Sequence, residues 1–135
     1  MEFYLMTWDE SYQVGVSEID RQHRQLFELI NNLSQAVTSG YGEDIIGEVL
    51  VEMAAYADEH FKSEQLFLEK HPDYQTHFLK HWEFTKKCME LVLGFRRDKS
   101  VSWETLNYLA EWLQEHILQE DQRYFRELAE LGLLE

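Results

Sequence analysis

Four long amphipathic segments, with almost nothing to interrupt them, constrain this chain more than any other feature of its sequence. Apolar residues recur at three- and four-residue spacing over about 18–39, 43–70, 72–97 and 102–130, which is the periodicity of a helix with one buried face. Proline occurs once, at Pro72, and glycine six times in 135 residues. No segment alternates polar and apolar residues as a strand would. The chain is therefore predicted to be all-α.

The connections between the predicted helices are short, and short connections place successive helices side by side in opposite directions. Pro72 suits the first turn of the third helix, and Ser102 is a candidate N-cap of the fourth. We predict an antiparallel up-down-up-down four-helix bundle with an irregular N-terminal arm at residues 1–17. The whole chain, residues 1–135, is predicted to be a single domain.

Each predicted helix carries an apolar stripe that should face the core. On the third helix this stripe comprises Phe78, Trp82, Phe84, Met89, Leu91 and Val92. Cys88 lies seven residues after His81, on roughly the same helical face, and is predicted to be a buried core thiol. It is the only cysteine, so no internal disulfide can form.

The charge and the hydropathy of the chain exclude several classes of partner. Twelve basic and 26 acidic residues give a formal net charge of −14, which repels phosphate backbones and anionic lipid surfaces. No apolar run approaches the roughly 20 residues that cross a bilayer, and the N-terminus lacks a signal-peptide pattern. We expect no nucleic acid partner, no membrane insertion and a cytoplasmic location. A monomer is favoured.

Five of the six histidines fall at one level of the predicted bundle: His23, His60, His77, His81 and His116. Counted at about 1.5 Å per residue from the loop end near Gly40, they lie roughly 21–30 Å along it. Glu64 follows His60 by four residues, so both side chains can face the same seam. The sixth histidine, His71, matches no such position and is predicted to be a surface residue at the helix start.

Imidazole nitrogens combined with a few carboxylate oxygens suit iron, zinc, copper or nickel, whereas magnesium and calcium prefer oxygen ligands. Seven protein ligands are too many for one metal and reasonable for two. Two six-coordinate metals offer about 12 positions. Five histidines, two bridging carboxylates and a solvent-derived bridge would leave about one of them open. An apolar site of this kind suits one small molecule.

The identity of the second carboxylate is ambiguous on helical geometry. Glu120 follows His116 by four residues and fits a regular helix best. Asp121 follows it by five, which is about 140° further around an ideal helix. Spacing alone favours Glu120 and leaves Asp121 open.

Four motifs around these residues resemble the hemerythrin family, and in particular its single-domain bacterial form. They are GVSEIDRQHRQLFELINNL around His23, HFKSE at 60–64, HFLKHWEF at 77–84 and WLQEHILQEDQRYF at 112–125. The resemblance spans the chain from Trp8 onward, with the motifs in order and at compatible spacing.

The resemblance implies a non-haem di-iron centre with an oxo or hydroxo bridge. One iron would be held by His77, His81 and His116, the other by His23 and His60, with Glu64 and Asp121 bridging the pair. The family motif places the acid five residues after the histidine, which selects Asp121 over Glu120. A locally widened or bent helical turn near residues 116–121 would reconcile this choice with the geometry.

The resemblance also implies reversible binding of dioxygen, for storage, transport or delivery, and no enzymatic activity. Dioxygen would bind at the iron held by His23 and His60, within an apolar wall of Leu26, Phe61, Trp112, Leu113 and Ile117. These residues also fit an ordinary hydrophobic core.

Other functions could use the same di-iron site. The alternatives are an oxygen or redox sensor, or a protein that handles nitric oxide, peroxide or iron. A ferritin-like di-iron oxidase would require Glu-x-x-His motifs, and the sequence contains none.

Overall fold

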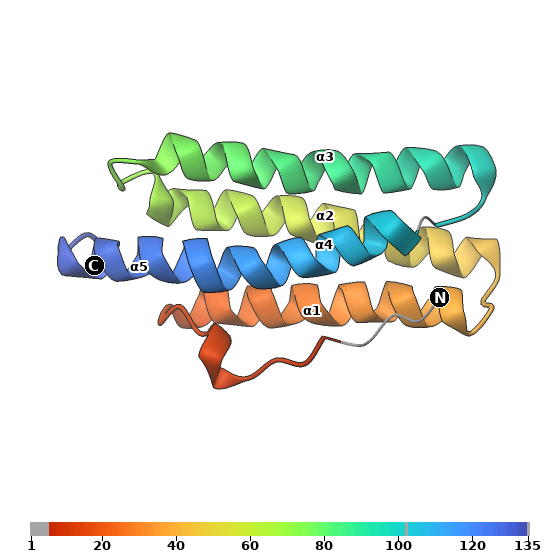
Figure 1. Ribbon diagram of the computed structural model, residues 1–135, viewed down its shortest axis with the longest axis horizontal. Coiled ribbons are helices and arrows are strands. Elements are labelled where there is room, and N and C mark those ends of the chain that lie inside the picture. Colours follow the sequence, from red (N-terminus) through yellow and green to blue (C-terminus); the bar gives the residue numbers. More distant parts are fainter. Residues whose placement is uncertain (1–5, 102, 135) are drawn as a thin grey trace.

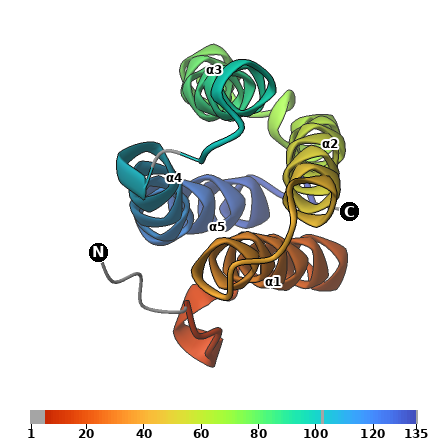
Figure 2. The same ribbon diagram turned by 90° about the vertical axis from the view of Figure 1, so that its right-hand side faces the viewer.

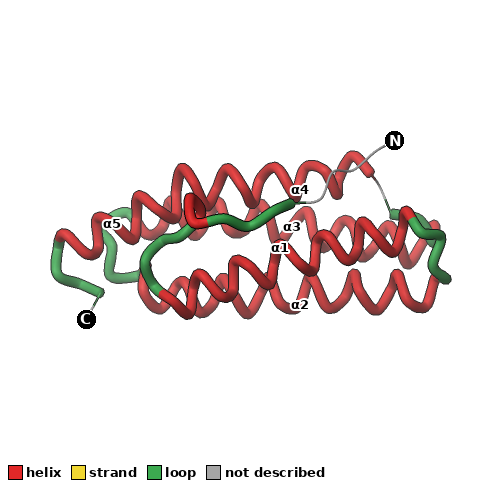
Figure 3. The backbone as a smooth tube through the Cα atoms, turned by 90° about the horizontal axis from the view of Figure 1, so that it is seen from below, coloured by secondary structure: helices red, strands yellow, loops and turns green. Residues whose placement is uncertain are grey.

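The computed structural model describes residues 6–101 and 103–134 (Figure 1), so the predicted N-cap Ser102 and residues 1–5 of the arm lie outside the described residues. Within these ranges the chain consists of helices and loops, with no strand (Figure 3). The elements are the 3-10 helix η1 (Glu10–Tyr12), α1 (Ser17–Thr38), α2 (Glu43–Leu68), α3 (Tyr74–Asp98), α4 (Trp103–His116), the π-helix η2 (Ile117–Asp121) and α5 (Gln122–Glu130).

The helices form four parallel columns whose chain direction alternates, as Figures 1 and 2 show together. Helices α1, α2 and α3 are three of the columns, and the continuous run of α4, η2 and α5 is the fourth. The prediction of an all-α, antiparallel four-helix bundle is confirmed. Within the described part of the chain, no helix combines the length and the apolar character needed to cross a membrane.

The core consists of two apolar clusters with a polar layer between them. The larger cluster fills the bundle toward the α1–α2 loop and includes Leu26 and Phe61. The smaller cluster is formed by Ile19, Leu68, Tyr124, Phe125 and Leu128. Along α1 and α2, therefore, His23 lies between Ile19 and Leu26, and Glu64 between Phe61 and Leu68. Apolar side chains therefore flank this layer on both sides along the bundle axis.

The predicted core face of α3 was wrong for three residues. Phe78, Trp82 and Met89 are about half exposed, at 48%, 51% and 49%. The buried side chains of α3 are instead His77, His81, Phe84, Cys88, Leu91 and Phe95. This series advances by three or four residues from the two histidines, so residues directly after a buried position point about 100° away. The inward face of α3 therefore carries the two histidines together with Phe84, Cys88, Leu91 and Phe95.

The start of α3 and the environment of His71 also differ from the prediction. The helix begins at Tyr74, and Pro72 lies in the preceding turn. His71 is buried, with its Nδ1 accepting a hydrogen bond from the backbone N–H of Asp73 (3.0 Å) and its Nε2 lying 2.8 Å from Glu127 Oε1. Asp73 has a non-helical backbone conformation, so the helix starts after it. The prediction that His71 is a surface residue was wrong, since its side chain is buried beside Glu127.

The N-terminal arm runs along the bundle between α1 and the fourth column (Figure 3). The carboxylate of Asp20 accepts hydrogen bonds from the backbone N–H groups of Val14 (2.8 Å) and Gly15 (3.3 Å). The side chain of Gln122 donates to the carbonyl oxygens of Ser11 and Gln13. The described part of the arm before α1, residues 6–16, is irregular as predicted apart from η1, and these contacts fix it over the side of the bundle that contains His23.

Cys88 is a buried core thiol, as predicted, with 3% of its surface exposed. Burial raises the pKa of this thiol to about 12. The pKa of this thiol is higher in the folded protein than in the unfolded chain. Its contribution to the free energy of unfolding is therefore fully present below the unfolded pKa and is lost as the pH rises toward about 12.

We expect Cys88 to be nearly inert in the native protein. A disulfide reagent at about pH 8 should modify it roughly 100- to 1,000-fold more slowly than in the urea-unfolded chain, since only the thiolate attacks. The rate is followed by absorbance of the released thiolate. Equal rates in the two states would show that the thiol is accessible and ionised.

Candidate metal centre

The structure brings all seven predicted ligand residues into the polar layer, from every column of the bundle. His23 comes from α1, His60 and Glu64 from α2, His77 and His81 from α3, and His116 and Asp121 from the ends of α4 and η2. Each is at most 5% exposed. The i, i+4 pairs on α2 and α3 point into the same layer because four residues make about one helical turn.

Glu64 lies between two groups of histidines. Its Oε1 is 3.0 Å from Nε2 of His81 and 3.3 Å from Nε2 of His77. Its Oε2 is 3.0 Å from Nε2 of His23 and 3.1 Å from Nε2 of His60. One carboxylate therefore directs one oxygen toward each group, as a bridging ligand does.

Asp121 divides its oxygens between the same two groups. Its Oδ1 lies 2.9 Å from Nε2 of His77 and 3.0 Å from Nε2 of His116, and its Oδ2 lies 3.3 Å from Nε2 of His23. Potential ligand atoms of Glu64, His77, His81, His116 and Asp121 all lie within 4.8 Å of one another, and so do those of His23, His60 and Glu64. Each group contains the histidines that the sequence analysis assigned to one metal position; Glu64 belongs to both groups and Asp121 to the first only.

The π-helix η2 explains why the acid five residues after His116 faces the histidines. The backbone N–H of Gln122 bonds to the carbonyl of Ile117, five residues earlier, so one turn contains an extra residue compared with an α-helix. The wide turn brings Asp121 under His116 and turns Glu120 outward, where it pairs with Lys80 and, at 2.9 Å, with Arg123. The predicted widened turn near residues 116–121 is confirmed.

The polar layer contains two buried carboxylates, Glu64 and Asp121, surrounded by imidazoles. Burial raises the pKa of Glu64, but the surrounding histidines outweigh it and hold that pKa well below its usual range. Burial lowers the pKa of His23 and His77, yet the carboxylates of Asp121 and Glu64 raise both to about 9. Burial lowers the pKa of His81 to about 4. The layer thus contains two anionic carboxylates beside at least one imidazole kept neutral by burial.

Several of these atoms have no hydrogen-bond partner among the described residues. They include Nε2 of His60, Nε2 of His81 and both carboxylate oxygens of Asp121, all buried. An unpaired buried carboxylate is costly, although imidazole nitrogens lie only about 3 Å away. Cations placed between the imidazole and carboxylate ligand atoms would satisfy both sets at once. Nitrogen-rich ligand sets with carboxylates suit iron and other transition metals, so the residues fit a pair of such ions.

The five residues predicted as an apolar wall all belong to the larger apolar cluster or pack against it. Leu26, Phe61, Leu113 and Ile117 are buried in the larger apolar cluster, and Trp112 packs against it. The ring of Phe61 stacks on His81 with centroids 4.1 Å apart, and that of Trp112 stacks on His116 at 4.3 Å. These contacts fix the orientation of both imidazoles and place hydrocarbon beside the ligand atoms.

Two residues near the site were missed by the sequence analysis. Gln22 is buried, and its Oε1 lies 2.8 Å from Nδ1 of His60. Tyr124 packs edge-on against His77 at 4.5 Å, and its hydroxyl donates to the Asp73 carboxylate at 3.1 Å. Gln22 directly precedes His23, so helical periodicity places it on another face and gives no signal. The position of Tyr124 three residues after Asp121 was the available hint.

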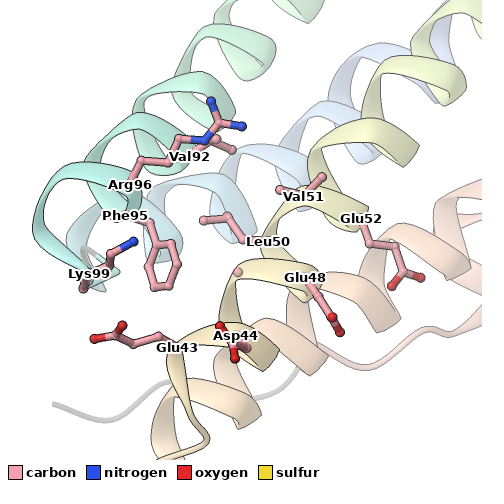
Figure 4. Close-up of a pocket in the computed structure, with 11 residues that line it drawn as sticks. Glu43, Asp44, Glu48, Leu50, Val51, Glu52, Val92, Phe95, Arg96 and Lys99 are labelled. Carbon is pink, nitrogen blue, oxygen red and sulfur yellow. The ribbon is translucent and has the colours of Figure 1, made fainter.

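The polar layer is separate from a surface hollow at the α1–α2 loop end of the bundle. A hollow of about 720 Å³ lies between the first turns of α2 and the last turns of α3 (Figure 4). Its lining residues include Glu43, Glu48, Phe95, Arg96 and Lys99, and no predicted ligand. The ligands lie in the interior of the bundle and not in an open cleft.

Comparisons with known proteins agree with this geometry. The family model described as hemerythrin HHE cation binding domain matches residues 14–128. A bacteriohemerythrin of Stenotrophomonas maltophilia is 34% identical over 122 residues, covering 89% of this chain and 79% of the relative. A bacteriohemerythrin of Clostridium acetobutylicum is 30% identical over 128 residues, covering 89% of this chain and 98% of the relative. A crystal structure of wild-type hemerythrin superposes with a TM-score of 0.83 at 28% identity, covering 91% of this chain and 97% of that one.

The fold and the ligand set together define a metal-binding four-helix bundle. The match over residues 14–128 is more specific, and the chain belongs to the hemerythrin family. This is a family of non-haem di-iron proteins that bind oxygen.

Proposed function

We propose that this protein binds dioxygen reversibly at a di-iron centre, for storage, transport or delivery, and does not act as an enzyme. The observation that carries the proposal is the pair of carboxylates that each divide their oxygens between two histidine groups. His77, His81 and His116 would hold one iron, His23 and His60 the other, with Glu64 and Asp121 shared. Relatives named bacteriohemerythrin, at 30–34% identity, support the same function.

Two iron ions, when bound, supply the electrons and the open coordination position that reversible binding of dioxygen requires. The protein supplies unequal numbers of nitrogen ligands, three imidazoles in one group and two in the other. The open position is therefore proposed beside His23 and His60. The two carboxylates offset the positive charge of the metals in a buried layer.

The proposed role of the apolar wall is to keep water and protons away from the bound gas. Leu26, Leu113 and Ile117 are at most 1% exposed. Hydrocarbon around the open position should slow the proton transfer to solvent that would make oxygen binding irreversible. The same side chains also contribute to the stability of the core.

We expect the anaerobically reduced, iron-loaded protein to develop a visible charge-transfer band on mixing with air, and to lose it again under vacuum. Repeated cycles should recover most of the amplitude. The measurement is an absorption spectrum in a sealed cuvette. Immediate oxidation without the reversible band would contradict oxygen carriage and would favour the sensing or redox alternatives.

Three further features of the protein remain predictions from the sequence. These are the monomeric state, the cytoplasmic location and the single-domain organisation over residues 1–135.

A further inference from the structure

His60 differs from two other histidines of the site in what its second nitrogen contacts. Nδ1 of His23 and Nδ1 of His77 are buried without a partner among the described residues. Nδ1 of His60 instead lies 2.8 Å from the side-chain oxygen of Gln22, which is itself 7% exposed. His60 belongs to the group with only two imidazoles, where the proposed open position lies.

The orientation of the Gln22 amide follows from its other neighbour. Its nitrogen Nε2 lies 3.1 Å from Oε1 of Glu18, one turn earlier on α1. The same carboxylate accepts two hydrogen bonds from Arg21, at 2.6 and 3.1 Å, and these hydrogen bonds lower the pKa of Glu18. An ionised carboxylate can only accept, so the NH₂ group of Gln22 faces Glu18 and its oxygen faces His60.

The protonation state of the His60 nitrogens then follows. An amide oxygen can only accept a hydrogen bond, so Nδ1 of His60 must carry a proton and donate it. In the neutral imidazole the other nitrogen, Nε2, is then bare. It lies 3.1 Å from the carboxylate oxygen Oε2 of Glu64 and has no hydrogen bond. A bare nitrogen and a carboxylate oxygen are both acceptors, and a cation placed between them would satisfy both.

We propose that Gln22 locks His60 in the tautomer with its proton on Nδ1, and that Glu18 fixes the Gln22 amide in the orientation that does so. Gln22 is a positioning residue that keeps Nε2 available to a metal before any metal arrives. As a neutral acceptor, it also leaves the imidazole less electron-donating than a carboxylate partner would. The inference rests on the proposed function for the identity of the ion and not for the state of the imidazole.

The test compares the wild type with Gln22→Met, which keeps the length of the side chain and removes its hydrogen bonds. Gln25→Met, the same change on the same helix at a position outside the site, is the matched control. In ¹⁵N-labelled, metal-free protein at neutral pH, His60 should show a protonated Nδ1 and a bare Nε2 in the wild type and the control. In Gln22→Met the proton should move to Nε2, which can then donate to Glu64.

Affinity for ferrous iron gives the second readout. Under anaerobic competition with a chelator, Gln22→Met should weaken the second equivalent of iron by about 10- to 100-fold, the usual cost of losing a partner of a metal-bound histidine. Gln22→Glu keeps an accepting oxygen toward His60 and should keep its proton on Nδ1, although it loses the hydrogen bond to Glu18. A merely structural role for Gln22 would change stability but not the tautomer.

An unchanged His60 tautomer in Gln22→Met, with iron affinity equal to that of the control, would overturn the inference. The tautomer is read without metal or oxygen, so it is independent of the proposed function. If it shifts as expected while the wild type fails to bind oxygen reversibly, the role of Gln22 stands and the proposed function fails.

Discussion

Glu64→Gln is expected to lower the iron content from about two ions per chain to well below one. The substitution preserves the volume of the side chain but removes the negative charge and one of the two accepting oxygens that Glu64 directs at His23, His60, His77 and His81. Both proposed iron positions lose a ligand at once, and an amide does not offset the charge of two cations as a carboxylate does. Iron is measured by elemental analysis after anaerobic loading and desalting.

Glu59→Gln is the matched control, because Glu59 lies on the same helix and is exposed to solvent. It should retain the full iron content. A second readout is the change in Tm on adding a chelator. The wild type should lose several degrees, since a ligand at about 100 times its Kd contributes about 2.7 kcal/mol to the folded state. Glu64→Gln should lose almost none, and a variant that still binds two ions would refute the bridging role.

Asp121→Ala is expected to abolish binding of at least one iron, whereas Glu120→Ala should leave the iron content unchanged. Asp121 is 1% exposed and within 3.3 Å of Nε2 atoms from both histidine groups. Glu120 pairs with Lys80 and Arg123 near the surface, where an ion pair contributes roughly 0–1 kcal/mol. The comparison tests the π-helix directly, because in a regular α-helix the acid four residues after His116 would face the metals.

Elemental analysis and thermal unfolding of the two variants give the decisive comparison. Glu120→Ala should shift Tm by no more than a few degrees in either direction. Iron loss in Glu120→Ala together with retention in Asp121→Ala would show that Glu120, and not Asp121, is the metal ligand. Such a result would require a regular helix at residues 117–121 in solution.

Several features could be predicted from the sequence because they depend on local spacing. The three- and four-residue periodicity predicts four helices, and the short connections predict their antiparallel order. The level shared by five histidines follows from counting residues along those helices. The pairs His60–Glu64 and His77–His81 are one turn apart, so each pair shares a face in any regular helix.

Other features depended on contacts between segments far apart in the chain. The buried face of α3 contains His77 and His81, which meet Glu64 and His116 from other helices. Phe78 and Trp82 directly follow these histidines and are exposed, although they are among the largest apolar residues of α3. His71 is buried, and its Nε2 pairs with Glu127, 56 residues later in the chain. The polar partner of His60 is Gln22, 38 residues earlier on another helix. No spacing rule within one helix reports such pairs.

The sequence by itself determined the bundle and the level shared by five histidines, because periodicity and spacing are properties of single helices. The division of those histidines into two groups came from the family resemblance of its motifs. On helical spacing alone it favoured Glu120, and only the family motif selected Asp121. In the tertiary structure Asp121 lies beside the histidines and Glu120 pairs with Lys80. Packing of the fourth column against the other three is compatible with a π-turn of five residues at Ile117–Asp121, and that extra residue rotates one acid into the polar layer and the other out to Lys80.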